Sequence, residues 1–163
     1  MRKGKKITVL GAGNVGASIA YTLTMDGMAS EIVLIDINEK KAQGEAADIL
    51  QGTPFHAGGY EDAGNSDIVI GTVGMARKPG QTRIDLAQAN VDIVKSVMPQ
   101  ITRFAPDAVY VVVSNPVDII TYAILKTTHL SESQVVGSGT MLDSARLRSR
   151  LAAHVGLNSK NVH

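Results

Sequence analysis

The sequence predicts an α/β fold in which a doubly wound parallel sheet carries helices on both faces. Three observations lead to this class. Short runs rich in valine and isoleucine recur along the 163 residues, longer segments with helical apolar spacing separate most of them, and the first run enters a glycine-rich turn. Strands buried on both faces have continuous apolar runs, and their alternation with helices indicates parallel pairing.

Five segments have the short β-branched runs of strands: residues 7–10, 32–35, 68–73, 109–113 and, more weakly, 135–136. Five others have the apolar spacing of helices: residues 15–25, 39–51, 84–104, 118–127 and 142–155. The glycine-rich stretch 52–66 holds one short strand or none. Ligands of such a sheet sit beyond the carboxyl ends of its strands, so the residues after each strand are the candidates for function.

The first strand runs into the turn Gly11-Ala12-Gly13-Asn14-Val15-Gly16, and a helical pattern follows. Gly11 permits the tight turn, and Gly13 lets a pyrophosphate approach the backbone without meeting a Cβ. Gly16 lets the helix pack against its strand, and the N–H groups of that helix point at the phosphates. This order of strand, turn and helix is typical of a Rossmann-type dinucleotide-binding fold.

Asp36 ends the second strand, 20 residues after Gly16. A carboxylate there accepts hydrogen bonds from both ribose hydroxyls and repels a 2′-phosphate, so the expected cofactor is NAD and not NADP. Two other interpretations of the chain require fewer functional residues. A noncatalytic NAD-binding module requires only the turn and Asp36, and a scaffold without a ligand requires the glycines only as turn residues.

Residues 74–83, after the third strand, contain three cations, a proline and two glycines. One interpretation is a solvated basic connection. The other is a closing loop that brings Arg83 onto a substrate carbonyl, where a guanidinium stabilises developing negative charge once water is excluded.

Residues 114–118, after the fourth strand, read Ser-Asn-Pro-Val-Asp. Asn115 can donate an amide N–H to a bound oxygen, and its bond to Pro116 is of the kind that adopts the cis form. Capping alone also explains the segment, as a helix start with proline near its first position and Asp118 in its first turn.

The segment after the fifth run places Asp143 and Arg146 three residues apart, hence on one face of a helix that Thr140 can cap. An ordinary surface ion pair, worth a few tenths of a kcal/mol, is the simplest interpretation. The alternative is a substrate-binding arginine beside a catalytic acid.

Taken in order, the motifs GAGNVG, LID, ARKPGQTR, SNPVD and GSGTMLDSARLR resemble those of the L-lactate/malate dehydrogenase family along essentially the whole chain. The resemblance implies that NAD is bound by a set of residues from the strand ends: Gly11, Gly13, Asn14, Val15, Gly16, Asp36, Thr72, Gly74 and Asn115. It implies substrate binding by Arg77, Arg83, Asn115 and Arg146, and catalytic roles for Arg83 and Asp143.

That family transfers a hydride between the nicotinamide and C2 of a 2-hydroxy or 2-oxo acid, while a histidine exchanges the proton on the substrate oxygen. The family histidine lies in a Gly-Glu-His-Gly segment, and none of the four histidines here has that context. We therefore expect residues 1–140 to form the NAD-binding domain and residues 141–163 the first helix of a truncated substrate domain. Such a chain is expected to be inactive alone.

Two signals conflict on the substrate. Arg77 stands where the family separates lactate from malate, and a buried guanidinium facing a methyl group would be unpaired, which favours malate. The segments SNPVDI and GSGTMLDSARLR resemble the lactate branch of anaerobic Gram-positive bacteria, and overall resemblance favours L-lactate and pyruvate slightly.

The composition excludes several partner classes. Sixteen basic and fifteen acidic residues give a net charge of +1, so no single-sign field suggests nucleic acid or an anionic membrane. The sequence has no cysteine, which excludes disulfides and thiolate metal sites, and no metal site is expected. We expect a cytoplasmic protein that forms a homo-oligomer, by resemblance a tetramer.

Overall fold

The computed structural model describes residues 4–49, 54–76 and 79–162. Six parallel strands form one sheet in the order β3-β2-β1-β4-β5-β6, which confirms the predicted doubly wound α/β fold. The strands are β1 (Lys6–Leu10), β2 (Glu31–Ile35), β3 (Phe55–Ala57), β4 (Ile68–Gly71), β5 (Val109–Val112) and β6 (Val135–Gly137). The α-helices are α1 (Asn14–Met25), α2 (Glu39–Ile49), α3 (Arg83–Phe104), α4 (Val117–Thr127) and α5 (Met141–Val155). Three 3₁₀ turns complete the described chain: η1 (Tyr60–Ala63), η2 (Glu132–Gln134) and η3 (Ser159–Asn161).

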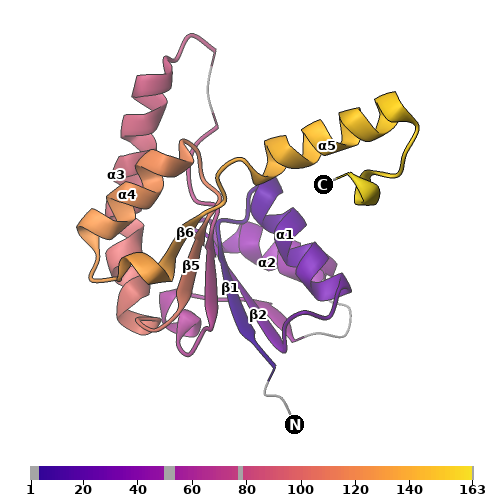
Figure 1. The fold of residues 1–163 in the computed structure, drawn as a ribbon. Helices are drawn as coiled ribbons and strands as arrows, with labels where there is room; N and C mark the ends of the chain where they lie inside the picture. Colours follow the sequence, from indigo (N-terminus) through magenta and orange to yellow (C-terminus); the bar gives the residue numbers. More distant parts are fainter. Residues whose placement is uncertain (1–3, 50–53, 77–78, 163) are drawn as a thin grey trace.

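Helices α1 and α2 cover one face of the sheet, and α3 and α4 cover the other (Figure 1). Alternation along each strand divides the core between these faces. In β2, Ile32 and Leu34 pack with α1 and α2, whereas Val33 and Ile35 pack with α3 and α4. The chain leaves β1 toward β2 on one side and reaches β4 on the other, so the order reverses beside β1. A crevice therefore opens at the carboxyl ends of β1 and β4.

The glycine-rich stretch that the sequence left open contains one short strand, β3, and the turn η1. Strands β4 and β5 end at Gly71 and Val112, earlier than the apolar runs predicted. Val73 is apolar because it packs against the core beneath α3, and not because it continues the strand. Apolar runs indicate which residues are buried, and burial extends past the last residue that pairs with a neighbouring strand.

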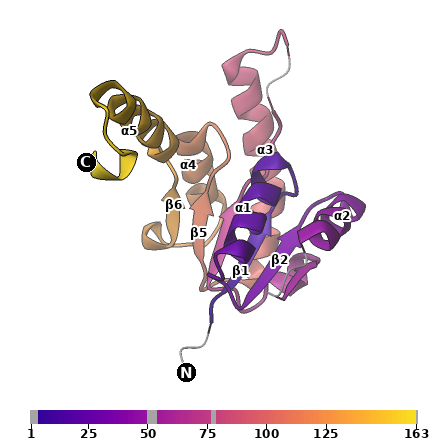
Figure 2. The same cartoon turned by 90° about the vertical axis from the view of Figure 1, so that its right-hand side faces the viewer.

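Helix α5 projects away from the sheet (Figures 1 and 2). Ala152 is the one buried residue of this helix, and α5 packs on η3. The expectation that the Thr140 side chain caps α5 is wrong. Thr140 occupies the N-cap position, but its near-helical backbone, with φ −91° and ψ 16°, differs from the extended conformation from which an N-cap hydroxyl reaches the helix N–H groups. Among the described residues, no helix has both the length and the apolar character needed to cross a membrane.

Candidate dinucleotide-binding site

The turn between β1 and α1 requires glycine at its first and last positions. Gly11 has φ +100°, and its N–H donates to the Ile35 carbonyl at 2.7 Å, which ties the end of β1 to the end of β2. A Cβ on Gly16 would lie 1.8 Å from the Gly11 carbonyl oxygen, far inside van der Waals contact. Glycine at both positions is therefore a requirement of the fold itself.

Gly13 differs from these two glycines, because its backbone is extended, with φ −73° and ψ 177°. A Cβ built there would meet no atom of the described chain within 4 Å. Gly13 is the N-cap of α1, and no side chain caps that end of the helix within the described part of the chain. The end of α1 thus offers free N–H groups and a path for close approach, as a pyrophosphate requires.

The Asp36 carboxylate is held beside the glycine turn by two backbone donors. Its Oδ2 accepts a hydrogen bond from the Ala12 N–H at 2.7 Å, and its Oδ1 accepts one from the Asn38 N–H at 2.8 Å. Each carboxylate oxygen retains acceptor capacity for a further donor. The arrangement suits two ribose hydroxyls and disfavours a phosphate at the same place.

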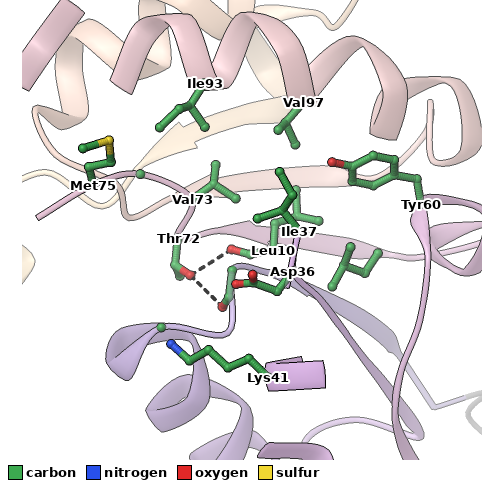
Figure 3. A pocket seen from close by; sticks show the side chains of 14 residues that line it. Leu10, Asp36, Ile37, Lys41, Tyr60, Thr72, Val73, Met75, Ile93 and Val97 are labelled. Carbon is green, nitrogen blue, oxygen red and sulfur yellow. Dashed lines mark hydrogen bonds between the residues drawn. The ribbon is translucent and has the colours of Figure 1, made fainter. Parts of the chain in front are cut away.

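Thr72 supports the turn from the neighbouring strand. Its hydroxyl lies near the carbonyl oxygens of Leu10 at 2.8 Å and Gly11 at 3.1 Å, and it donates to them (Figure 3). This hydroxyl also faces the space that a Cβ on Gly16 would enter, at 2.8 Å. The structure thus gives Thr72 a defined role in shaping the turn.

These groups lie at one cavity of about 390 Å³ at the carboxyl ends of β1 and β4. Figure 3 shows Asp36 and Thr72 on one side of it and Ile93 and Val97 of α3 on the other. Fourteen residues line the cavity: Leu10, Gly11, Gly13, Ile35, Asp36, Ile37, Lys41, Tyr60, Thr72, Val73, Gly74, Met75, Ile93 and Val97. A polar edge beside an apolar wall suits a ligand that joins a sugar phosphate to a flat, weakly polar base.

Sequence reasoning missed the apolar wall. Ile37 is 97% exposed directly after Asp36, and an apolar side chain at the tip of a polar loop is a signal that could have found it. Ile93 and Val97 carry no such signal, because their spacing on α3 is also that of ordinary core residues. Lys41 brings an ammonium group to the polar side, but in the sequence it resembles Lys40, the other exposed lysine of its helix.

Asn115 lies in the loop between β5 and α4. The peptide bond from Asn115 to Pro116 is cis, as the sequence favoured. No hydrogen bond from a described residue engages the Asn115 side chain, so its amide is available to a ligand, and its backbone carbonyl accepts a hydrogen bond from Asn90. Helix α4 begins at Val117 with Asp118 in its first turn, as expected of a helix start, but Pro116 occupies the N-cap position and no side chain of the described residues caps this helix.

Arg83, Asp143 and Arg146 do not line this cavity. Arg83 is exposed and is the first residue of α3. The start of this helix extends beyond the sheet (Figure 1). Asp143 and Arg146 form an ion pair at 3.2 Å on α5, with their side chains 72% and 66% exposed. Arg77 lies outside the described residues.

Asn14 and Val15 form the exposed first turn of α1, beside the turn glycines. The structure therefore brings the glycine turn, Asp36, Thr72 and Gly74 together, and it does not bring α5 to them. None of the described residues forms a cluster of histidine and acidic side chains that could hold a metal ion.

A family model described as "lactate/malate dehydrogenase, NAD binding domain" matches residues 5–137. The chain is 46% identical to L-lactate dehydrogenase 1 of Clostridium acetobutylicum, over 100% of this chain and 54% of that protein. It is 48% identical to an L-lactate dehydrogenase of Acetivibrio thermocellus, over 98% of this chain and 52% of that protein. The chain thus spans about half the length of the curated relatives it matches.

Solved structures show the same likeness. The ligand-bound minor L-lactate dehydrogenase of Enterococcus mundtii superposes with a TM-score of 0.93 at 40% identity, covering 98% of this chain and 53% of that one. The apo malate dehydrogenase of Picrophilus torridus gives a TM-score of 0.91 at 36% identity, and the match covers 97% of this chain and 53% of that one. Together with the glycine turn and the placement of Asp36, these matches show that the chain belongs to the lactate/malate dehydrogenase family and contains its NAD-binding domain.

Proposed function

We propose that this chain is the cofactor-binding part of an NAD-dependent dehydrogenase that acts on a small 2-hydroxy acid. The observation that carries this proposal is the placement of Asp36, whose carboxylate is fixed on two backbone donors beside Gly13. An acid held there binds the adenosine ribose, and the uncapped start of α1 binds the pyrophosphate. The nicotinamide of NAD, when bound, accepts or gives the hydride.

The residues of this chain position that chemistry. The Asn115 amide donates a hydrogen bond to the substrate oxygen near the nicotinamide, and Arg83 approaches from the start of α3 to stabilise charge on that oxygen. Arg146 pairs with the substrate carboxylate, and Asp143 orients the proton-exchanging histidine, so their mutual ion pair in this structure would be exchanged for those partners. These roles rest on the resemblance of the motifs.

We propose that this chain alone binds NAD without turnover. His56 lies on the edge strand β3, His129 follows α4, and His154 lies in the last turn of α5. None of these three histidines lines the cavity. Residues 141–163 are proposed to belong to a second, substrate-binding unit, which agrees with the separation of α5 from the sheet. The complete enzyme is proposed to be a homotetramer, which light scattering would test.

L-lactate and pyruvate are the proposed substrate pair, supported by the similarity to the L-lactate dehydrogenases of Clostridium acetobutylicum and Acetivibrio thermocellus. The competing pair is malate and oxaloacetate, which Arg77 favours because its guanidinium would match a second carboxylate.

A chimera tests the choice, with this chain in place of the matching half of the Clostridium acetobutylicum enzyme. The measurement is kcat/KM for pyruvate and oxaloacetate, with Arg77→Gln beside it. A higher value for oxaloacetate that Arg77→Gln abolishes would reverse the assignment. A chimera that binds NADH but turns over neither substrate would favour a noncatalytic module.

The cofactor assignment is tested by titrating the chain with NADH and NADPH and following nicotinamide fluorescence. The unmodified chain is expected to prefer NADH by about tenfold or more, the effect of about 1.4 kcal/mol of repulsion at a 2′-phosphate. Asp36→Ser removes that charge, so it is expected to weaken NADH binding and to reduce the preference for NADH over NADPH. A chain that binds neither nucleotide would favour the scaffold interpretation.

A further inference from the structure

One polar side chain interrupts the apolar stripe that α3 turns toward the core. Asn90 is 2% exposed, and the other buried residues of this helix are Val94, Met98 and Ile101. Placing an amide in such a stripe costs free energy unless each of its polar atoms finds a partner. The hydrogen bonds that Asn90 makes therefore identify what keeps it there.

All of those partners lie on the loops after β4 and β5, the first of which lines the cavity through Gly74 and Met75. The Asn90 Oδ1 accepts a hydrogen bond from the Met75 N–H at 2.7 Å, in the loop after β4. The Asn90 Nδ2 donates to the Asn115 carbonyl at 2.8 Å, in the loop after β5, and to the Met75 carbonyl at 3.4 Å. Asn90 thus uses one acceptor and one donor to join the two loops, and an amide has both.

Gly74 fits against this amide. Its φ is +148°, and a Cβ there would lie 3.2 Å from the Asn90 Oδ1 and 3.3 Å from its Cγ and Nδ2. A second link runs parallel to the first, because the Ser114 hydroxyl donates to the Val73 carbonyl. The loops after β4 and β5 are therefore joined to each other before any ligand arrives.

We propose that Asn90 is a positioning residue that sets the nicotinamide half of the site by fixing the Gly74-Met75 backbone relative to Asn115. The inference rests on the proposed function, and it concerns only one half of the cofactor. The adenosine ribose at Asp36 lies on the β2 side of the crevice, so the other half of the dinucleotide extends past β4 toward β5. Asn90 lies on that second side, and the hydrogen bonds that hold Asp36 do not involve it.

The test compares NAD with ADP-ribose, which has the same adenosine, pyrophosphate and second ribose but no nicotinamide. Isothermal titration of the chain with each ligand is carried out for the unmodified protein, Asn90→Asp and Asn90→Leu. Both variants are expected to lower NAD affinity about fivefold to tenfold, the effect of one lost hydrogen bond at the site. The affinity for ADP-ribose is expected to stay within about twofold.

Asn90→Asp adds a second measurement, the pH dependence of NAD affinity, which loss of packing alone would not change. Its carboxylate keeps the acceptor for the Met75 N–H but faces the Asn115 carbonyl without a proton to donate. Protonation restores a donor, so the NAD affinity of this variant, relative to ADP-ribose, is expected to recover as the pH falls from 8 to 5.5. Asn90→Leu is expected to show no such recovery. Gln100→Glu, an amide-to-acid change on α3 whose amide donates within the helix, is the matched control.

Equal losses of NAD and ADP-ribose affinity, unchanged NAD affinity in both variants, or no recovery of Asn90→Asp at low pH would each overturn the inference. Circular dichroism at each pH checks folding, and if Asn90→Leu does not fold, Asn90→Asp at acid pH carries the test. An unmodified chain that binds neither ligand overturns the proposed function as well, so the two failures are distinguishable.

Discussion

The turn between β1 and α1 shows that one residue type can be required for different physical reasons. Gly16 is needed because a side chain would collide with the Gly11 carbonyl, and Gly11 because of its φ of +100°. Gly13 has an ordinary extended backbone and open space where a Cβ would lie. The fold requires glycine at positions 11 and 16, whereas at position 13 glycine leaves the start of α1 open to a ligand.

Gly13→Ala is therefore expected to leave stability unchanged and to weaken NADH binding. Alanine adopts the backbone of residue 13 without strain, but its methyl group occupies the approach of the pyrophosphate to α1. We expect a loss of about tenfold or more in NADH affinity by fluorescence titration, with the melting temperature unmoved. Gly44→Ala, at an exposed position of α2 where a Cβ also meets nothing, is the control.

Gly16→Ala, unlike Gly13→Ala, is expected to lower the stability of the fold. Its Cβ cannot be accommodated 1.8 Å from a backbone oxygen, so α1 must move away from β1. We expect the free energy of unfolding to fall by about 3 kcal/mol, the upper range for overpacking of a core. Urea denaturation followed by circular dichroism measures it, and a loss below that of a typical surface substitution would contradict the clash.

At the scale of elements, β5 is anchored by a buried hydroxyl far from the ligand end of the sheet. Tyr110 is 2% exposed, and its hydroxyl donates to the Ala105 carbonyl at 2.8 Å, at the connection between α3 and β5. Burial raises the pKa of the Tyr110 hydroxyl well above its ordinary value of 10. The hydroxyl therefore stays protonated in the folded chain at pH values where an exposed tyrosine ionises.

Tyr110→Phe is expected to lower the free energy of unfolding by about 1 kcal/mol and to leave NADH affinity unchanged. The sign of the pH effect follows from the raised pKa. In the unfolded chain Tyr110 ionises near pH 10, whereas in the folded chain its hydroxyl stays protonated at that pH. The stability that the protonated hydroxyl contributes is therefore complete below pH 10 and is lost as the pH rises above it. Urea denaturation at pH 7 and pH 10.5 should show a smaller decrease in stability for Tyr110→Phe than for the unmodified chain.

At the scale of the whole molecule, the described chain consists of a packed sheet with four helices and a fifth helix that stands off it. Helix α5 has exposed apolar side chains along its length, and Asp143 and Arg146 pair on its surface. An exposed pair of this kind contributes little to stability. We therefore propose that the sheet with α1 to α4 is the folded unit, and the family match spans residues 5–137.

A chain that ends at Gly139 is accordingly expected to melt within about 3 °C of the longer one, the shift that about 1 kcal/mol produces at this size. Its NADH affinity is expected to stay within about twofold, because α5 lines no part of the cavity. Differential scanning calorimetry and NADH titration measure both. A large drop in melting temperature would show that α5 and η3 stabilise the sheet.

The sequence predicted the sheet, its parallel pairing and the glycine turn because these depend on local chemistry. Apolar runs, helical spacing and turn glycines are each set by residues close together in the chain. Asp36 was predicted for the same reason, since its distance from Gly16 is counted along the chain.

The tertiary structure decided the rest. The apolar wall formed by Ile37, Ile93 and Val97, and the link from Asn90 to Met75 and Asn115, join segments far apart in sequence. A buried asparagine on a helix gives no sign of its partners until the loops are in place. By itself, then, the sequence determined the glycine turn and the place of Asp36 after the second strand, where we expect the adenosine end of NAD to bind. Folding decided how the loops after β4 and β5 are joined, because hydrogen bonds between distant segments leave no periodic trace in the chain.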